Sequence, residues 1–461
     1  MPCTRFSIFY MPQEFIEIES LDMEGRGVGH LLNEDGTPGK VIFVEGALPG
    51  ERVSYQSYRR KPKWEAATVV DIQRASSLRV TPPCPHFGTC GGCAMQHLEP
   101  GAQVAIKQRV LEDNLKHIGR VSAETMLRPI YGPSWGYRYR GRLSIRYVVK
   151  KGKVLVGFHE RKSGFITDMG SCKVLPPNVS AMLLPLRELI GSLSIMDRVP
   201  QVEVAVGQGE QEKVTVLLLR IMEPLTADDE VLLKAFADEW RIQWWLQPKG
   251  PDTVYPFYPE QSDLHYVLPE FGVRMPFKPT DFTQVNHEIN RTLVSRALRL
   301  LDIQKDDRVA DLFCGLGNFT LPIATQASEV VGIEGSTALT ERAMQNAKAN
   351  GLDSKTQFYC RNLFEVTAQD LVELGKFDRM LIDPPRDGAM ALSQALGELA
   401  KEQPDMLPTR IVYVSCSPST LARDAGILVN EAGYVLKQAG VVNMFPHTAH
   451  VESIAVFERP Q

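Results

Sequence analysis

Residues 309–320 read VADLFCGLGNFT, and this stretch decides the fold. Its first four residues are a short, mostly apolar run, as expected for a buried strand that leads into a turn. Gly315 and Gly317 follow, where the backbone must bend tightly or let a ligand approach closely. Asn318 is a residue type that can cap the helix expected behind the turn. The pattern predicts a strand, a glycine turn and a helix.

An acidic residue follows the glycine turn at a distance typical of nucleoside-binding folds. The next strand-like run, residues 330–333, ends on Glu334, about 20 residues beyond Asp311. A carboxylate there suits a ribose, whose hydroxyls need hydrogen-bond acceptors. The pyrophosphate-binding version of this turn has a third glycine where this chain has Thr320. The pattern therefore favours S-adenosylmethionine over NAD.

Strand-like and helix-like segments alternate from residue 309 to the end of the chain. An amphipathic helix precedes them, with an apolar stripe of Ile289, Leu293, Ala297, Leu298 and Leu301. The expected strands are residues 309–312, 330–333, 357–360, 377–382, 410–415 and 453–458. This alternation predicts an α/β fold with a parallel, doubly wound, Rossmann-like sheet, and a ligand at the carboxyl ends of its strands.

Reactive side chains stand beside three of these strands. Asp383 follows the run 377–382 and begins the sequence DPPR, whose prolines impose a stiff, extended turn. Cys416 follows the run 410–415. Glu452 lies just before the last strand and can serve as a general base if it is partly buried.

Cys416 is the cysteine with the surroundings expected of a nucleophile. Ser417 or Ser419 could cap the next helix, which would place Cys416 near a helix N-terminus and lower the pKa of its thiol. Cys314 and Cys360 have no such neighbours, and we expect them to be small buried hydrophobic residues.

The N-terminal region has the signals of a small β-barrel. Short strand-like runs separated by turn residues continue to about residue 73. Between two of these runs, the segment SYRRKPKW interleaves cations with aromatic rings. Such a segment can grip a phosphate backbone and stack on bases, or it can be a solvated hairpin tip.

Cysteines further along the chain indicate a metal centre. Cys84, Cys90 and Cys93 follow a C-x5-C-x2-C pattern on a glycine-rich loop, and Cys172 could close the site. Four cysteines suit tetrahedral zinc or an iron–sulfur cluster, and spacing does not separate the two. Residues 135–173 are also strongly basic, and Arg138, Arg140 and Arg142 have the period of two that puts strand residues on one face. Such a row favours RNA or DNA as a partner over a merely solvated face.

The composition limits the classes of protein to which the chain can belong. A net charge of −4 requires any nucleic-acid role to come from a local patch. No apolar run approaches the roughly 18 residues of a membrane span, and the first ten residues lack the features of a signal peptide. The eight cysteines then read as thiols or metal ligands in a cytoplasmic protein.

The motifs DLFCGLGNFTLP, IDPPRDG, VSCSPSTLARD and HVESI resemble those of the S-adenosylmethionine-dependent RNA uracil-C5 methyltransferases. The N-terminal barrel resembles the TRAM RNA-binding domain. The four-cysteine pattern resembles the 4Fe–4S site of bacterial members that act on 23S ribosomal RNA. One departure is Ser417, since the family usually has SCNP where this chain has SCSP.

The resemblance implies three domains: a TRAM-like barrel at 12–73, a central β-rich domain with the cluster at 74–280, and a class I methyltransferase domain at 281–461. A helical segment near 100–120 would pack on the catalytic domain. Cys416 would be the nucleophile that adds to C6 of uracil, and Glu452 the base that removes the C5 proton. The residues expected to line the cofactor and target pocket are Gln284, Phe313, Asn318, Glu334, Asn362 and Asp383.

The expected substrate is a uridine in 23S ribosomal RNA, flipped out of its helix, with no DNA or membrane partner and a monomeric enzyme. Asp383 or Gln284 would read the Watson–Crick edge of the base. The alternatives are a non-catalytic RNA-binding protein with a methyltransferase fold, and methylation of transfer RNA, whose enzymes resemble this chain without the cluster or TRAM domain. An exocyclic-amine methyltransferase would normally have an aromatic residue where this chain has Arg386.

Overall fold

The computed structural model describes residues 15–209 and 213–460. Residues 12–14 of the expected barrel, and the first ten residues considered for a signal peptide, lie outside the described part. The described residues form two compact units. One comprises residues 15–83, Cys93–Gln103 and His447–Ala449, and the other comprises Cys84–Gly92, Val104–Pro446 and residues 450–460.

The first unit contains a six-stranded sheet in the order β1-β5-β6-β4-β3-β2. The strands are β1 (Phe15–Glu17), β2 (Ser20–Leu21), β3 (Gly27–Leu32), β4 (Pro38–Glu45), β5 (Arg52–Arg60) and β6 (Trp64–Arg74). Because residues 15–21 pair with β5 at one end and with β3 at the other, the sheet closes on itself. Its core is apolar and consists of Ile16, Ile18, Ile42, Val44, Ala47, Val53 and Ala67.

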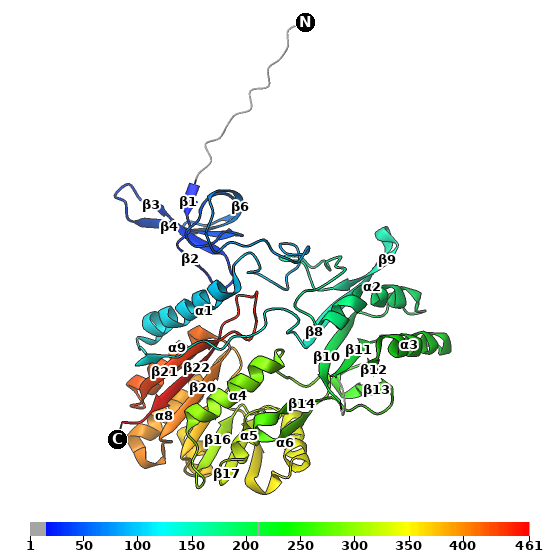
Figure 1. Ribbon diagram of the computed structural model, residues 1–461. Helices are drawn as coiled ribbons and strands as arrows, with labels where there is room; N and C mark the ends of the chain where they lie inside the picture. The colour runs from blue at the N-terminus through cyan, green and yellow to red at the C-terminus, as the bar shows by residue number, and fades with distance from the viewer. Residues whose placement is uncertain (1–14, 210–212, 461) are drawn as a thin grey trace. The chain divides into compact units, whose positions relative to one another are not determined.

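One layer of the second unit is an eight-stranded sheet in the order β18-β17-β16-β19-β20-β22-β21-β7 (Figure 1). Its strands are β7 (Thr125–Met126), β16 (Arg308–Leu312), β17 (Glu329–Glu334), β18 (Thr356–Cys360), β19 (Arg379–Ile382), β20 (Arg410–Ser415), β21 (Val435–Val442) and β22 (Glu452–Glu458). The six predicted strands are present. The prediction of a wholly parallel sheet is wrong, because β22 runs antiparallel to both β20 and β21.

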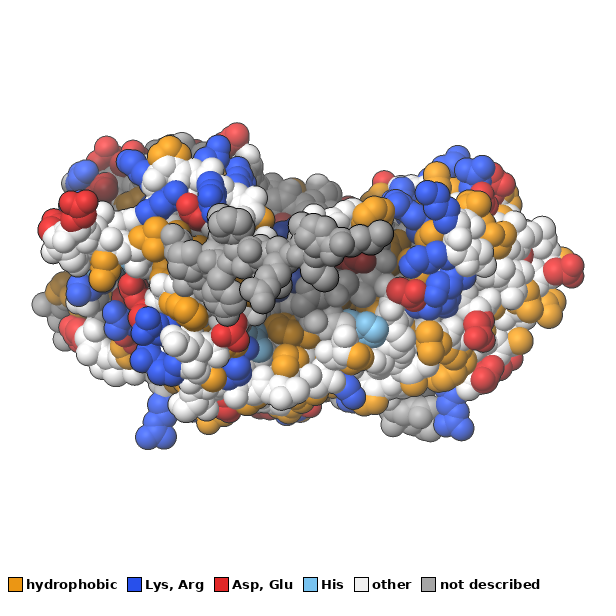
Figure 2. Space-filling view, turned by 90° about the horizontal axis from the view of Figure 1, so that it is seen from above, with side chains coloured by type: hydrophobic (Ala, Val, Ile, Leu, Met, Phe, Trp, Pro, Cys, Tyr) orange, Lys and Arg blue, Asp and Glu red, His pale blue; other side chains and the backbone are white. Residues whose placement is uncertain are grey.

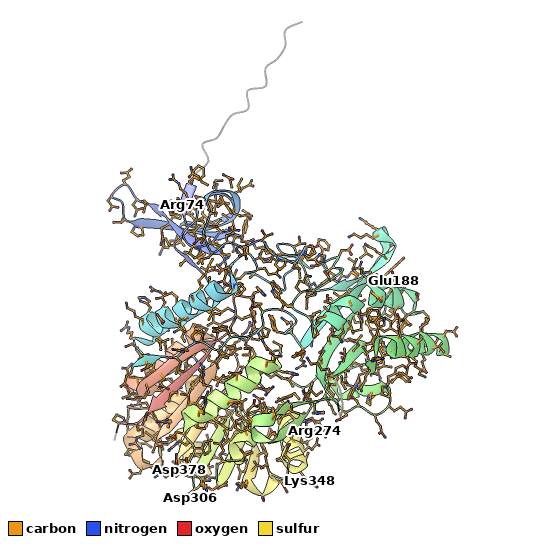
Figure 3. The ribbon with its side chains drawn as sticks, viewed as in Figure 1. Arg74, Glu188, Arg274, Asp306, Lys348 and Asp378 are labelled. Carbon is orange, nitrogen blue, oxygen red and sulfur yellow. The ribbon has the colours of Figure 1, made fainter. Side chains whose placement is uncertain are left out.

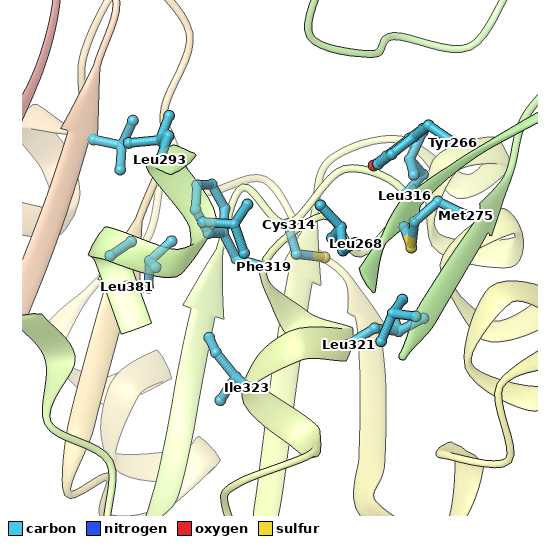
Figure 4. Close-up of a cluster of buried hydrophobic side chains, with 14 of the residues drawn as sticks. Tyr266, Leu268, Met275, Leu293, Cys314, Leu316, Phe319, Leu321, Ile323 and Leu381 are labelled. Carbon is cyan, nitrogen blue, oxygen red and sulfur yellow. The ribbon is translucent and has the colours of Figure 1, made fainter. Parts of the chain in front are cut away.

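Helices cover both faces of this sheet, as in a doubly wound fold. They are α4 (His287–Leu301), α5 (Thr320–Ala324), α6 (Thr337–Ala349), α7 (Ala368–Leu374), α8 (Met390–Glu402) and α9 (Pro418–Asn430). One apolar core joins α4, α5 and α6 to one face through residues such as Leu293, Leu321 and Ala343 (Figure 4). The second core joins α7, α8 and α9 to the other face. Alternating strand residues, such as Val309 and Ala310, enter opposite cores.

A second sheet of the same unit has the order β13-β12-β11-β10-β14-β15, and β8 pairs with both β10 and β9. Its strands are β8 (Arg140–Val148), β9 (Lys153–Gly157), β10 (Gln201–Gln208), β11 (Lys213–Arg220), β12 (Ile242–Gln247), β13 (Tyr255–Tyr258), β14 (His265–Leu268) and β15 (Val273–Pro276). Two helices accompany it, α2 (Pro177–Ser192) and α3 (Ala227–Trp240). Tyr266 and Met275 of the β14–β15 hairpin enter the same apolar core as Leu293 of α4.

Helix α1 (Pro100–Asn114) continues into a π-helical turn at Leu115–Gly119. A Cβ atom added to Gly119 would lie 2.4 Å from the carbonyl oxygen of Ala422, so this turn packs closely against α9. The following strand, β7, pairs with β21. Within the described part of the chain, no helix combines the length and apolar character that a membrane span requires.

Asp306 and Asp378 mark the end of the β16–β22 sheet at which strands β16 and β19 begin (Figure 3). The Oδ2 atom of Asp378 accepts a hydrogen bond of 2.9 Å from the backbone N–H of Arg308, which joins the starts of the two strands. The carboxyl ends of these parallel strands, and the residues that follow them, therefore lie at the opposite end of the sheet along the strand direction.

Substituting Gly317 with Ala should destabilise the fold. Gly317 has a φ of +96°, and an added Cβ would lie 2.5 Å from Cδ1 of Leu321. We expect Gly317→Ala to lower the free energy of unfolding by about 1–2 kcal/mol or more, measured by urea denaturation. Gly351→Ala is the matched control, since Gly351 also has a positive φ but has open space around it. Equal losses in the two variants would contradict the argument from packing.

Candidate active site

A cavity of about 600 Å³ opens at the carboxyl ends of β16, β17, β19 and β20. It brings together residues that are far apart in the chain, from Arg138 to Glu452. All eight residues predicted for catalysis or the pocket line it: Gln284, Phe313, Asn318, Glu334, Asn362, Asp383, Cys416 and Glu452. The structure thus gathers these side chains around one space large enough for a small molecule.

The glycine turn after β16 forms one wall of the cavity. Gly315 and Gly317 have φ values of +56° and +96°, as the predicted turn requires, and Phe313 also adopts a positive φ of 64°. The carboxylate of Glu334 accepts hydrogen bonds from the backbone N–H groups of Gly315, at 3.0 Å, and Ser336, at 3.1 Å. These two bonds hold the Glu334 side chain at the cavity wall.

Asn318 does not cap the following helix, so this prediction is wrong. Helix α5 begins at Thr320 without a side-chain cap. The amide of Asn318 exchanges two hydrogen bonds with that of Asn290, at 2.8 and 3.0 Å, and accepts a third from the hydroxyl of Tyr266 at 2.9 Å. The Asn318 side chain is therefore fixed by residues of α4 and β14. At the position where the pyrophosphate-binding turn has its third glycine, this chain has Thr320, whose hydroxyl donates a hydrogen bond to the buried carboxyl group of Asp311.

Cys416 and Glu452 face each other across two neighbouring strands. β20 pairs antiparallel with β22, and Ser415 lies opposite Ser453. One step further along this register, Cys416, just beyond β20, lies opposite Glu452, the first residue of β22. The pairing thus places a thiol and a carboxyl group at the same end of the cavity.

The prediction of a lowered thiol pKa for Cys416 is wrong. Burial raises the pKa of Cys416 to about 12, and the nearby carboxyl groups of Glu452 and Asp383 act in the same direction, while Arg386 opposes them. Ser417 precedes α9 but makes no capping bond, and its hydroxyl oxygen lies 3.2 Å from that of Ser419. Desolvation therefore outweighs any effect of the helix end.

The carboxyl groups of the cavity are also perturbed by burial. Desolvation raises the pKa of Asp383 to about 7 and that of Glu452 to about 8. For Glu452, Asp383 adds to this rise, while Lys107 and Arg386 oppose it. Glu452 is 6% exposed, so the burial expected of a general base is present. Both groups can change protonation state near neutral pH.

Apart from Phe313, the aromatic residues of the cavity wall were not predicted from the sequence. The rings of Phe313 and Phe364 have centroids 5.7 Å apart, and those of Phe445 and His450 are 5.4 Å apart. Phe364 and His450 each lie two residues from a predicted site residue, which is the signal that could have revealed them. The remaining lining residues outside the predicted set include Tyr266, Phe282 and Arg138.

The other cysteines outside the cysteine-rich loop behave differently from one another. Cys314 is buried, as predicted, and lines the cavity. The prediction that Cys360 is buried is wrong, because it ends the edge strand β18 and is exposed.

Three of the four predicted metal-binding cysteines lie in one unit. Cys172 interacts electrostatically with Cys90 and Cys84, and burial raises the pKa of both Cys90 and Cys172. Cys93 belongs to the other compact unit and follows Cys90 by three residues. Among the described residues, no group of three or more His, Cys, Asp or Glu side chains has the arrangement of a metal site.

The three arginines predicted to form one row are placed differently from one another. Arg140 and Arg142 lie on β8, but Arg138 precedes the strand and lines the cavity. Arg142 forms an ion pair of 2.8 Å with Glu203, and an Nη atom of Arg140 donates to the carbonyl of Pro279 at 3.0 Å. The Nε atom of Arg138 donates to the carbonyl oxygen of Arg140 at 3.1 Å. Protein groups therefore already engage all three guanidinium groups.

The chain is similar to known proteins over nearly its whole length. A family model described as tRNA (Uracil-5-)-methyltransferase matches residues 272–460. The chain is 68% identical to the 23S rRNA (uracil(1939)-C(5))-methyltransferase RlmD of Cupriavidus necator, over 96% of this chain and 100% of the relative. It is 69% identical to the protein of that name from Burkholderia ambifaria, over 97% of this chain and 96% of the relative.

A solved structure resembles the fold of nearly the whole chain. It is the Pyrococcus abyssi tRNA (uracil-54, C5)-methyltransferase in complex with S-adenosyl-L-homocysteine, with a TM-score of 0.71 and 24% identity. The match covers 96% of this chain and 100% of that chain. At this identity the likeness concerns the fold.

The buried carboxyl of Glu452 should make stability depend on pH. Because the pKa of Glu452 is raised, the folded protein holds the Glu452 proton more tightly than the unfolded chain does. The stabilisation that this proton provides is therefore complete below the pKa of Glu452 in the unfolded chain, and it is lost as the pH rises through about 8. The variant Glu452→Gln does not have this proton to lose. Between about pH 6 and pH 9, its free energy of unfolding should therefore fall less than that of the unmodified protein, and the difference should be up to a few kcal/mol.

Urea denaturation across this pH range measures the effect. Glu458→Gln is the control, because this residue lies at the other end of β22 and pairs with Arg410 on the protein surface. Parallel curves for Glu452→Gln and the unmodified protein would contradict the assigned burial penalty.

Proposed function

The chain belongs to the S-adenosylmethionine-dependent RNA uracil-C5 methyltransferases, and we propose that it methylates C5 of one uridine in 23S ribosomal RNA. The names of the relatives give this position as uracil 1939. The observation that carries the proposal is the pairing of Cys416 with Glu452 in a cavity large enough for a cofactor and a flipped base. A non-catalytic RNA-binding protein would have no use for this pair.

The chemistry of uracil explains why both groups are needed. C5 is a weak nucleophile, so the Cys416 thiolate first adds to C6 and moves an electron pair toward C5. C5 then attacks the methyl group of the sulfonium cofactor, which leaves as the neutral thioether. Glu452 removes the C5 proton, the C5–C6 double bond re-forms, and the Cys416 thiolate is released.

The high pKa of Cys416 requires an account of its proton. In the site without ligands, Glu452 and Asp383 disfavour the thiolate. The positive charge of the bound sulfonium would favour both the thiolate and the carboxylates, since opposite charges lie close together in a dry cavity. The proposed mechanism therefore couples cofactor binding to the ionisation of Cys416 and Glu452, whose protons pass to the solvent.

The remaining lining residues have proposed binding roles. Glu334 offers its carboxylate to the ribose hydroxyls of the cofactor, while Phe313 provides an apolar wall for the cofactor. Asn318 and Asn362 are polar groups for the rest of the cofactor, and Gln284 and Asp383 are the groups for the Watson–Crick edge of uracil. Asp383 can offer a proton donor or an acceptor, because its pKa is about 7.

A 4Fe–4S cluster held by Cys84, Cys90, Cys93 and Cys172 is part of the proposal. The surroundings of two of these cysteines suit thiolate ligands, since the backbone nitrogen of Gly92 lies 3.4 Å from Sγ of Cys90, and the backbone N–H groups of Val174 and Leu175 hydrogen-bond to Cys172. N–H groups aimed at sulfur stabilise thiolate ligands. Cys93 enters the proposal through its spacing in the sequence alone. The cluster would organise the cysteine loops, since the cavity already holds the reacting groups.

RNA contacts are proposed for two basic hairpins, one in each unit. In the first unit, which we propose to be a TRAM-like domain, Arg59 lies over the ring of Trp64 at 5.3 Å, and the exposed Lys61 and Lys63 form the turn. In the second unit, Lys and Arg side chains gather near the β8–β9 hairpin (Figure 2), which contains the exposed Lys150. We further expect a monomer acting in the cytoplasm, with transfer RNA as the nearest alternative substrate.

The roles of Cys416 and Glu452 can be separated by substitution. Cys416→Ala should abolish turnover while cofactor binding persists, because no bond to C6 can form. Glu452→Gln should still allow addition and methyl transfer but should stall before release, since the C5 proton stays in place. It should accumulate a protein–RNA adduct that survives denaturing electrophoresis and carries the methyl label.

The double variant is the control, and it should form no adduct because the attacking sulfur is absent. Normal turnover by Glu452→Gln, or an adduct in Cys416→Ala, would show that the roles are assigned wrongly. Release of tritium from uridine labelled at C5 separates this reaction from methylation of an exocyclic amine.

Protein prepared without oxygen should be brown and contain about four iron and four sulfide per chain. Cys90→Ser should lose most of the iron and unfold at a lower temperature, because a ligand is removed from the cluster. Cys360→Ser is the control and should keep its metal, since Cys360 is exposed at the edge of the catalytic sheet. Stoichiometric zinc without iron would refute the proposed cluster.

A further inference from the structure

Helix α1 contains a buried lysine that the proposed mechanism does not use. Lys107 is 2% exposed, and its neighbours along the same face of the helix, Val104 and Leu111, belong to an apolar core. An ammonium group among apolar residues is costly unless opposite charge and hydrogen-bond acceptors surround it. Apolar packing alone therefore does not explain why a lysine is buried at this position.

The Lys107 ammonium has two acceptors on the connection between β21 and β22. Its Nζ donates to Oδ1 of Asn443 at 2.8 Å and to the carbonyl oxygen of Phe445 at 2.9 Å. Phe445 lines the cavity, and the same connection leads to Glu452 at the start of β22. Lys107 thus holds the segment that carries part of the active site.

Both acceptors are neutral, so the charge of Lys107 needs a separate partner. Burial lowers the pKa of Lys107 to about 7, and Glu452 is the group that opposes this change. The interaction is mutual, because Lys107 also lowers the pKa of Glu452. The ammonium and the carboxyl group therefore stabilise each other's charged form across the core.

Other charged groups near Glu452 do not replace Lys107. The titratable and charged groups that act on or face this carboxyl are Asp383 after β19, Arg386 in the following turn, Cys416 after β20, His450 in the connection and Lys107 on α1. Asp383 opposes ionisation of Glu452, and Arg386 shares its guanidinium with His450, at 3.3 Å from Nδ1. Lys107 is the larger of the two favourable influences on Glu452.

We propose that Lys107 is a positioning residue for the proton-abstraction step, supplying the counter-charge of the Glu452 carboxylate and tying the β21–β22 connection to α1. This inference rests on the proposed function, in which Glu452 is the base. It concerns the step after methyl transfer, so it separates Lys107 from residues that bind RNA or the cofactor. The ammonium stays in place and transfers no proton to the substrate.

Lys107→Met tests the charge while keeping a side chain of similar length. Single-turnover reactions with methyl-labelled cofactor would follow two rates, the formation of the labelled adduct and its release as product. We expect release to slow about tenfold or more near neutral pH, with adduct formation changed much less. The pH midpoint of the release rate should rise by about one unit, because Glu452 ionises less readily without the cation.

Two variants serve as controls. Lys107→Arg keeps the charge and should retain a pH midpoint close to that of the unmodified enzyme. Arg109→Met removes a cation from the exposed side of the same helix and should change neither rate. If Lys107→Met does not fold, Lys107→Gln and Lys107→Arg provide the same comparison of a neutral with a charged side chain.

The outcomes distinguish this inference from the proposed function. An unchanged pH midpoint in the neutral variants, or an equal slowing of adduct formation and release, would overturn the role of Lys107. Failure of Glu452→Gln to accumulate an adduct would instead overturn the assignment of Glu452 as base, whatever the Lys107 variants do.

Discussion

The antiparallel pairing of β20 with β22 is the constraint on which the active site depends. Ser415 and Ser453 lie opposite each other, and this register sets Cys416 against Glu452 at the end of the sheet. A slip of one residue would turn one of these side chains to the other face. The strands are held on both sides by apolar residues such as Val412 and Tyr413, so the geometry of the reacting groups is determined by the packing of the core.

The same packing creates an electrostatic problem. Asp383, Cys416 and Glu452 are acidic groups in one largely buried space, and each has a raised pKa. In the proposed mechanism, positive charges favour the ionised forms of these groups. Arg386 and Lys107 supply such charges from the protein, and the sulfonium supplies one from the cofactor. Burial thus favours the neutral form of each group, most strongly that of the Cys416 thiol, which limits unproductive reactions of this thiol before the substrates bind.

Much of the fold could be predicted from the sequence, because six of the eight strands of this sheet appear as runs of strand-forming residues, and motif residues stand beside several of these runs. The eight residues predicted for the site all line the cavity, and each could be picked out because it stands beside such a run or in a motif. β21 was missed, and with it the antiparallel direction of β22. The connection from β21 to β22 is too short for a crossover helix, which would have indicated a hairpin once β21 was recognised.

Other features were inaccessible because they arise from contacts between distant segments. Tyr266 reaches the cavity from β14, and Lys107 looks like any other lysine of a helix until its burial is known. The raised pKa of Cys416 comes first from burial of its thiol and then from the carboxyl groups of Glu452 and Asp383, which belong to other segments, so local sequence indicated the opposite direction.

The central claim is that Cys416 bonds to C6 of a uridine during methylation at C5. RNA with 5-fluorouridine at the target position tests it, because fluorine replaces the proton that the base must remove. We expect an RNA-bound protein that carries the methyl group, and mass spectrometry should locate the bond on the peptide that contains Cys416. An adduct on Cys314 or Cys360, or methylation without any adduct, would contradict this account.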